Sequence, residues 1–198
     1  TAGLILLAEP IIRLIFEHGA FTPADTIATA RTLSLYTVGL FAYSANKVLV
    51  PAFYAIGKTR YPVIASFLAI LFNIAIITAT IDRFQHLSIA FSTSCTMLLN
   101  FLFLSVVLYW KMGGFNLPYL FKGLVKILTA SALMAVWLYF GAGPFASWLH
   151  GNAAQQLVAT FGLILSGGLL YGIVLSRLGM PELNDLLARI RARFRRQA

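Results

Sequence analysis

Four long apolar runs, which follow one another from residue 61 onward, constrain the fold of this chain more than any other feature. They lie at about Tyr61–Ile81, Leu87–Trp110, Pro118–Phe140 and Ala153–Ser176. Each is near the roughly 20 residues that an α-helix needs to cross the hydrocarbon core of a bilayer. Charged residues make up only 11% of the chain, well below the roughly 25% found in soluble domains. The sequence therefore predicts an all-α, polytopic integral membrane protein.

The N-terminal residues predict part of another span. The segment Leu4–Phe16 is apolar except for Glu9 and Arg13, whose i,i+4 spacing places them on one helix face as a structural ion pair. The chain starts with TAGLILLAEP, without an initiator Met or a basic region ahead of the apolar run. This start does not resemble a signal peptide, and we expect the chain to be the C-terminal portion of a longer protein.

A fifth full span is predicted between residues 22 and 56. Thr22 is a favourable N-cap and Pro23 suits the first helical position, and a helix that begins there can continue to Ile56. Such a helix is about 50 Å long, so in a bilayer it must tilt, protrude or kink, and Pro51 provides a site for a kink. We thus expect a helical bundle with the end of one span, five full spans and a C-terminal basic amphipathic helix.

The predicted bundle has three parts. Residues 1–112 form a partial lobe, residues 113–180 a two-helix hairpin, and residues 181–198 a cytoplasmic tail. The tail, PELNDLLARIRARFRRQA, combines five arginines with an apolar face, a pattern typical of helices that lie on anionic membrane surfaces. A solvated charged tail is the alternative interpretation.

The net charge of +9 supports a membrane topology. In a soluble protein it would suggest nucleic acid, but here the charges lie mainly at the ends of apolar runs, so we expect anionic lipids and no nucleic acid as partners. Successive spans alternate sides, and one side holds most of the positive charge. Its members are Lys58, Arg60, Lys111, Lys122, Lys126, Arg177 and the tail arginines. The positive-inside rule makes this side, and hence the C-terminus, cytoplasmic.

A lysine and a proline occupy unusual positions in the long helix. If the inner boundary lies near Gly57, Lys47 is about 15 Å deep, where a lysine costs roughly 2.5–3.5 kcal/mol. Pro51 removes the N–H that would bond the carbonyl of Lys47. No carboxylate of the chain is expected at this depth, so Lys47 is predicted to face a cavity, a partner or an anionic ligand. The alternative is a packing kink, with Lys47 in a structural pair.

Asparagines extend this candidate substrate cavity. Asn46 precedes Lys47, and Asn73 and Asn100 lie near the middle of two adjacent antiparallel spans. For Asn73 and Asn100 an interhelical hydrogen bond is the favoured interpretation, and lining of the cavity is the other. Four hydroxyl residues of the span that carries Asn100 either line a polar path or bond back to their own helix. They are Ser92, Thr93, Ser94 and Thr96.

The last two spans are almost wholly apolar. Lys122 and Lys126 lie one turn apart near the inner boundary, where they are predicted to contact lipid phosphates. Gly168 and Gly172 form a GxxxG pattern, which favours a close-packed hairpin. The remaining apolar faces fit ordinary lipid or the tail of a lipid substrate, and the sequence by itself favours ordinary lipid.

Residues suited to catalysis or metal binding are few. All three histidines fall on the predicted outer side, where each is more consistent with a separate wet loop than with a shared metal site. They are His18, His86 and His150. Asp82, Arg83 and His86 form the one interfacial cluster of the kind that a polyprenyl-phosphate enzyme needs. We therefore expect a protein that is not an enzyme and has no metal or cofactor.

Two blocks of the sequence resemble a known family. EPIIRLIFEHGAFTPADT, followed by KVLVPAFYAIGKTRYPV, is similar to the MurJ (MviN) family of bacterial lipid II flippases, within the multidrug/oligosaccharidyl-lipid/polysaccharide exporter superfamily. The family pattern is roughly E-P-I-I-R-L-L-F-E-R-G-A-F and K-V-L-x-P-x-F-Y-A-x-x-D-T-x-T-P-V. The chain departs from it at His18, Lys58 and Tyr61, where the family often has Arg, Asp and Thr.

The resemblance implies fourteen spans in two lobes around a central cavity. Alternating access would move the lipid-linked peptidoglycan precursor, lipid II, across the bacterial inner membrane, a role in cell wall biogenesis and cell shape. This chain would hold the end of the ninth span through the fourteenth, with the N-terminal lobe of the same protein as its partner. Lys47 matches the family motif and would line the cavity, and the last two helices would form a groove for the isoprenoid tail. The sodium site of some members is not implied, because Ile77 stands where a carboxylate would follow Asn73.

Other classes remain open from the sequence. One is a drug or polysaccharide exporter of the same superfamily, and a less favoured one is a membrane enzyme that acts on polyprenyl phosphates. A membrane scaffold would not explain a lysine near the middle of the bilayer.

Overall fold

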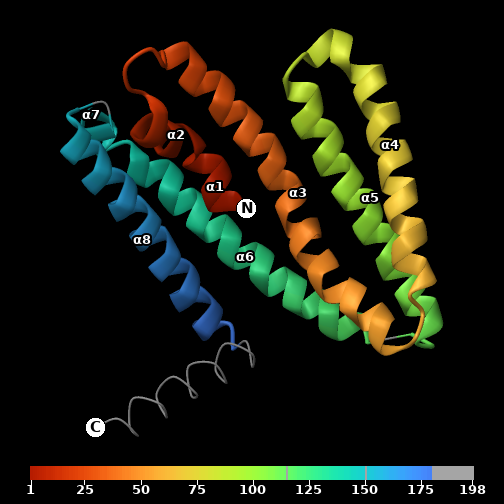
Figure 1. Cartoon of the computed structure of the whole chain (residues 1–198). Helices are drawn as coiled ribbons and strands as arrows, with labels where there is room; N and C mark the ends of the chain where they lie inside the picture. The colour runs from red at the N-terminus through yellow and green to blue at the C-terminus, as the bar shows by residue number, and fades with distance from the viewer. Residues whose placement is uncertain (115, 150, 180–198) are drawn as a thin grey trace, which may run out of the picture. The chain divides into compact units, whose positions relative to one another are not determined.

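The described part of the chain, residues 1–114, 116–149 and 151–179 of a computed structural model, consists of α-helices and short connections (Figure 1). The helices are α1 (Ala2–Leu6), α2 (Ala8–Phe16), α3 (Pro23–Ala55), α4 (Arg60–Phe84), α5 (Leu87–Lys111), α6 (Leu117–Ala142), α7 (Ala146–Leu149) and α8 (Ala153–Arg177). They divide into one unit of Gly3–Phe115 and a second that begins at Asn116. This division lies beside the predicted boundary between residues 112 and 113. The predicted tail helix, residues 181–198, lies outside the described residues.

Local chemistry sets the ends of the first three helices. The predicted helix over residues 4–16 is divided at Leu7 into α1 and α2. At the start of α3, Thr22 Oγ1 accepts a hydrogen bond from the backbone N–H of Asp25, and the Asp25 carboxylate accepts one from the N–H of Thr22. This capping box satisfies two N–H groups that a helix start leaves unpaired, which confirms the predicted N-terminus. After α3, Gly57 has φ +68, a left-handed conformation that glycine adopts without strain.

Helix α5 lies between α3 and α4, although α4 comes first in the chain (Figure 1). In the first half of both helices, Ser94 Oγ of α5 donates to the carbonyl of Leu35 in α3 at 2.6 Å. Near their ends, the buried Phe53 of α3 packs in one cluster with Leu104 and Leu108 of α5. The two contacts follow the same order in both helices, so α3 and α5 run in the same direction.

Helices α4 and α5 form an antiparallel hairpin joined at Gln85 and His86. At the turn, Ser88 Oγ donates to the carbonyl of Thr80 at 2.8 Å. Several small hydroxyl residues of α5 are buried, and they let the neighbouring helices approach closely. They are Ser88, Ser92, Ser94 and Thr96.

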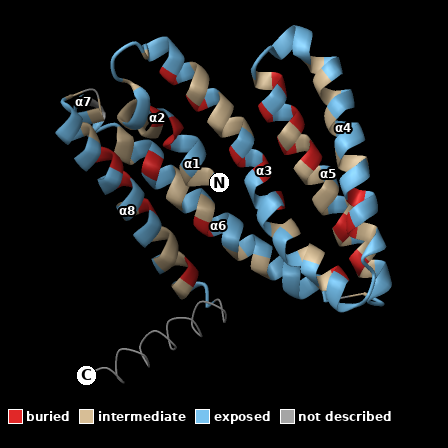
Figure 2. Cartoon of the chain, viewed as in Figure 1, coloured by how far each residue is buried: buried red, intermediate tan, exposed pale blue. Residues whose placement is uncertain are grey.

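Four of the described helices, α4, α5, α6 and α8, are long and apolar enough to cross a membrane. Many of their large apolar side chains are exposed within each unit (Figure 2), a surface that lipid or further helices must cover. The sequence predicts five full spans, and the difference is α3, which lacks a sufficiently apolar window. The physical reason is that polar residues occur on several faces of α3, among them Thr37, Asn46 and Lys47.

The second unit packs α6 against α8, but not through the predicted GxxxG pair. A Cβ added at Gly168 or Gly172 would meet no atom within 4 Å, whereas one added at Gly167 would lie 3.0 Å from Leu138 Cδ2. Adjacent helix positions are about 100° apart, so the contact face of α8 runs through Leu163 and Gly167. The expected close approach at Gly168 and Gly172 is therefore wrong within the described hairpin, and Gly167 makes it instead.

Candidate functional site

The exposed face of α3 carries the candidate site. Its residues recur every three or four positions, which places them in one row along the helix, and every one of them is exposed within the first unit. This row, which we call the α3 stripe, consists of Tyr36, Leu40, Tyr43, Lys47, Pro51 and Tyr54. On another face of the same helix, Ala42 and Phe53 are fully buried. The helix thus packs on one side and presents a lysine and three tyrosines on the other.

Lys47 has an aromatic partner but no acidic one. Its Nζ lies 4.6 Å from the centroid of the Tyr43 ring, within the range of a cation–π contact. No carboxylate of the described residues lies within 4.0 Å of this ammonium. The ring contact does not neutralise the positive charge, and Lys47 lies on an exposed face of α3.

Pro51 and Asn46 flank this lysine differently. Pro51 lies inside α3 on the stripe, and because it has no N–H it leaves the Lys47 carbonyl without its usual helical partner. Asn46 lies on the packed side of α3, and its buried Oδ1 has no hydrogen-bond partner among the described residues. The structure thus places Pro51 beside Lys47 on one face and turns Asn46 away from it.

Asn73 and Asn100 do not bond to each other. Asn73 Nδ2 donates across the α4–α5 hairpin to Ser92 Oγ at 3.5 Å and to Thr96 Oγ1 at 3.4 Å. These bonds are long and therefore weak. The Oδ1 atom of Asn100 is buried and has no hydrogen-bond partner in the described part of the chain. The favoured interhelical bond exists for Asn73, but with hydroxyl groups rather than with the other amide.

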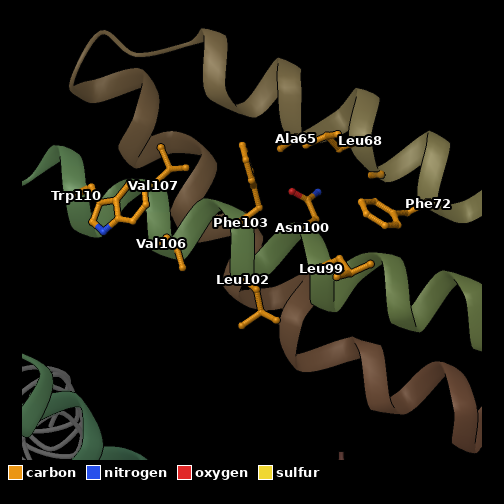
Figure 3. Close-up of a pocket in the computed structure, with 11 residues that line it drawn as sticks. Ala65, Leu68, Phe72, Leu99, Asn100, Leu102, Phe103, Val106, Val107 and Trp110 are labelled. Carbon is orange, nitrogen blue, oxygen red and sulfur yellow. The ribbon is translucent and has the colours of Figure 1, made fainter.

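Asn100 lines a hollow between α4 and α5 of about 480 Å³. Figure 3 shows its amide pointing toward α4, between apolar side chains such as Leu68, Phe72 and Phe103. Asn100 is the one residue with a polar side-chain amide or charge in this lining. The hollow is therefore almost wholly apolar, and its shape and lining suit an apolar chain.

The hydroxyl residues of α5 support packing rather than a continuous polar path. Thr93 Oγ1 donates to its own helix at the carbonyl of Ile89, and Ser92 Oγ does the same at 3.0 Å. Ser94 instead bonds to α3, as described above. Of the two interpretations offered by the sequence, bonding back to their own helix holds for Ser92 and Thr93. The structure also buries Ser92 and Ser94 between helices.

The predicted ion pair of α2 is confirmed and is part of a larger set. Arg13 Nη2 lies 2.8 Å from Glu9 Oε1, and Arg13 Nε lies 3.2 Å from Glu17 Oε2. Glu17 Oε2 also accepts a hydrogen bond from Thr26 Oγ1 of α3 at 2.6 Å. Because Thr26 is fully buried, this set fixes the end of α2 against the start of α3. Sequence spacing showed Glu9 but missed Glu17, which is also four positions from Arg13.

The two lysines of α6 differ in the second unit. Lys122 is exposed, whereas Lys126 Nζ donates to the carbonyl of Gly179 at 3.1 Å, just beyond the end of α8. A cation is favourable at the C-terminal end of a helix, where carbonyl groups are unpaired. Lys126 thus closes the α6–α8 hairpin, a role that the sequence did not indicate because the two residues are far apart in the chain.

Sequence reasoning missed the aromatic part of the α3 stripe. Tyr36, Tyr43 and Tyr54 are exposed on the same row as Lys47. Their spacing of seven and eleven residues was a usable signal, since both multiples return to one helix face. Within an apolar run, tyrosines resemble the other hydrophobic residues in composition, and only their periodicity distinguishes this row.

Comparisons with known proteins agree with this arrangement. The model of the family "Lipid II flippase MurJ" matches residues 1–187. A probable lipid II flippase MurJ of Buchnera aphidicola (subspecies Acyrthosiphon pisum) is 33% identical over 181 residues, which cover 91% of this chain and 35% of that protein. The corresponding protein of Vibrio cholerae is 30% identical, with 94% of this chain and 35% of that protein covered.

A solved structure described as lipid II flippase MurJ in an inward closed conformation shares the fold. Its TM-score is 0.73 at 30% sequence identity, and the match covers 94% of this chain and 36% of the solved chain. The chain thus spans about a third of the length of the relatives that it matches. With a family model that matches nearly the whole chain, and with a shared fold, the chain belongs to the MurJ family of lipid II flippases.

Proposed function

We propose that the chain forms the C-terminal part of a flippase that moves lipid II across the bacterial cytoplasmic membrane by alternating access. Membership of the MurJ family supports this role. The observation that carries it is Lys47, a cation on the exposed α3 stripe that has no carboxylate partner among the described residues. Lipid II carries a pyrophosphate, and a cation held away from carboxylates suits such an anion.

In this proposal α3 is a fifth full span and its stripe lines the substrate cavity. The helix has 33 residues and is about 50 Å long, enough to cross a bilayer. Lys47 lies eight residues before the end of α3 at Ala55, about 12 Å along the axis. A lysine at this depth is favourable where water or an anion meets it, which is the situation inside a transport cavity. An N-terminal lobe of the same protein would form the opposite wall.

The hairpin of α6 and α8 would guide the lipid tail. Its exposed apolar side chains offer a long surface for an isoprenoid chain, and Lys122 would contact lipid phosphates at the inner boundary. At the same predicted level, Lys111 Nζ lies 5.6 Å from the centroid of the Tyr61 ring. The positive-inside rule assigns this lysine-rich side, and the C-terminus with it, to the cytoplasm.

The test is complementation of a bacterial strain depleted of its own flippase, with the full-length protein that contains this segment. We expect Lys47→Ala to impair growth at normal expression, because the cavity loses its cation, while membrane insertion is unchanged. Lys58→Ala is the matched control, since it removes an exposed lysine of the turn after α3, outside the proposed cavity. Full growth with Lys47→Ala would remove Lys47 from the site.

Two further measurements test the two-lobe proposal and distinguish a lipid II flippase from a drug or polysaccharide exporter. The purified 198-residue chain in liposomes should transport no lipid II, because one wall of the cavity would be missing, and transport by it would contradict the two-lobe proposal. The full-length protein should translocate lipid II in the same assay. Export of cationic drugs or of polysaccharide without lipid II movement would instead favour the exporter of the same superfamily.

A further inference from the structure

The contact between Tyr43 and Lys47 gives the proposed cavity a second functional residue. The two residues are four positions apart on α3, and the Lys47 ammonium lies 4.6 Å from the centre of the Tyr43 ring. Side chains of a helix lean toward its N-terminus, so a residue covers the turn that precedes it. The contact is therefore built into one helix and does not depend on any neighbouring element.

The direction in which the Lys47 side chain extends differs from that of a lysine whose ammonium reaches the nearer membrane surface. The nearer end of α3 is its C-terminus, at Ala55, and lysines near a helix end usually extend toward that end. Lys47 instead extends toward Tyr43, which lies farther from Ala55. This direction follows the ordinary lean of a helical side chain, and the ring contact at its end keeps the ammonium on the deeper side of Lys47.

Arg13 and Lys47, two cations of the first unit, are held in different ways. Arg13 is neutralised by carboxylates of Glu9 and Glu17 at 2.8 and 3.2 Å. Lys47 contacts a neutral ring, whose quadrupole attracts the cation without cancelling its charge. A carboxylate beside Lys47 would compete with an incoming phosphate, whereas a ring fixes the position of the ammonium and leaves it able to bind an anion.

We propose that Tyr43 is a positioning residue that holds the Lys47 ammonium in the substrate path, where it meets the phosphate groups of an amphiphilic lipid substrate. This inference rests on the proposed function, because it assigns the charge of Lys47 to substrate binding. The aromatic ring carries the effect, and the phenolic hydroxyl is not required for it.

The first test uses matched variants of the full-length protein in a lipid II translocation assay with proteoliposomes. Tyr43→Phe keeps the ring and should transport at the rate of the unchanged protein. Tyr43→Leu keeps an apolar side chain without a ring, and the rate at subsaturating substrate should fall about two- to thirtyfold, the range of a single cation–π contact. A normal rate with Tyr43→Leu would overturn the proposal.

A double-mutant comparison shows whether Tyr43 acts through Lys47. Tyr43→Leu should cause no further loss in a Lys47→Ala background, because the group that it positions is gone. Tyr36→Leu, which removes another ring of the stripe two turns away, should have the same effect with and without Lys47. An equal effect of Tyr43→Leu in both backgrounds would show an independent role and contradict the inference.

A graded series tests the ring electrostatics without changing its shape. Phenylalanines with one, two and three ring fluorines at position 43 weaken the quadrupole stepwise, so transport should fall stepwise with each fluorine. Equal transport rates across the fluorinated variants would indicate a purely structural role for Tyr43. This series remains informative if Tyr43→Leu fails to fold, because the ring keeps its shape. If Lys47→Ala itself transports normally, the proposed function of Lys47 fails. If only the Tyr43 variants are normal, that function stands and the positioning role alone is wrong.

Discussion

Gly39 marks a close approach of α3 and α5 that a single methyl group can test. A Cβ added at Gly39 would lie 2.8 Å from Ser94 Cα and 2.9 Å from Ser94 Oγ. The nearest atom belongs to the backbone, so rotation of a side chain cannot relieve the contact. Gly39→Ala must therefore push α5 away from α3, which also strains the bond from Ser94 to the carbonyl of Leu35.

The expected loss follows from two opposing terms. Overpacking of a close contact costs about 1–3 kcal/mol, and a backbone clash places Gly39→Ala toward the upper end. Exchange of glycine for alanine in a helix gains about 1 kcal/mol, which leaves a net loss in the free energy of unfolding of about 1–2 kcal/mol. Gly168→Ala gains the same propensity without a clash, so the two variants should differ by about 2–3 kcal/mol.

The assay is equilibrium unfolding of the full-length protein in mixed detergent micelles, with both variants compared to the unchanged protein. Gly167→Ala provides an intermediate case, because its Cβ would meet the flexible end of Leu138 at 3.0 Å. The predicted order of stability is Gly168→Ala, then Gly167→Ala, then Gly39→Ala. Equal stability of Gly39→Ala and Gly168→Ala would refute the packing of α3 on α5 at this point.

Three further predictions use the same unfolding assay. Thr26→Val should lower the free energy of unfolding by about 1–2 kcal/mol, because the Glu17 carboxylate loses its buried donor. Thr26→Ser keeps the hydroxyl and should not lower it. Equal unfolding free energies for the two variants would contradict the role of the hydroxyl. Asn100→Leu should leave stability unchanged or raise it, because Oδ1 has no partner to lose, and a marked loss would reveal a structural partner. Asn73→Leu should cost less than about 1 kcal/mol, because its two bonds are long, and a larger cost would show that these bonds are stronger than their lengths indicate.

Much of the fold is encoded in local patterns that a sequence displays directly. The capping box at Thr22 and Asp25, the end of α3 before Gly57 and the Glu9–Arg13 pair each depend on residues within four positions of one another. Their geometry follows from helix periodicity alone. For the same reason the long apolar helices were predicted with nearly correct ends.

The predictions that were wrong concern contacts that depend on which face of a helix meets its neighbour. GxxxG predicted contact at Gly168 and Gly172, but the contact is at Gly167, one position away on a different face. Asn73 bonds to hydroxyl groups of α5 and not to Asn100. Small and polar residues mark the face that can pack, but the register between two helices is decided by all the side chains along them.

In the candidate site, too, local features could be predicted from the sequence and features that depend on neighbouring helices could not. Lys47 was identifiable because a lysine inside an apolar run is costly, and the depth could be counted from Gly57. Its contact with Tyr43 was within reach of i,i+4 reasoning. The turning of Asn46 toward the packed side was not, since it depends on where α5 lies.

Cysteine accessibility along α3 tests the central claim that its stripe lines a water-filled substrate path. In the full-length protein with Cys95 replaced by alanine, single cysteines at stripe positions 43, 47, 51 and 54 should react with a hydrophilic thiol reagent, and lipid II should protect them. Cysteines at Ala42 and Phe53, which are fully buried, should not react. Unreactive stripe positions, or equal reactivity on both faces, would contradict the account.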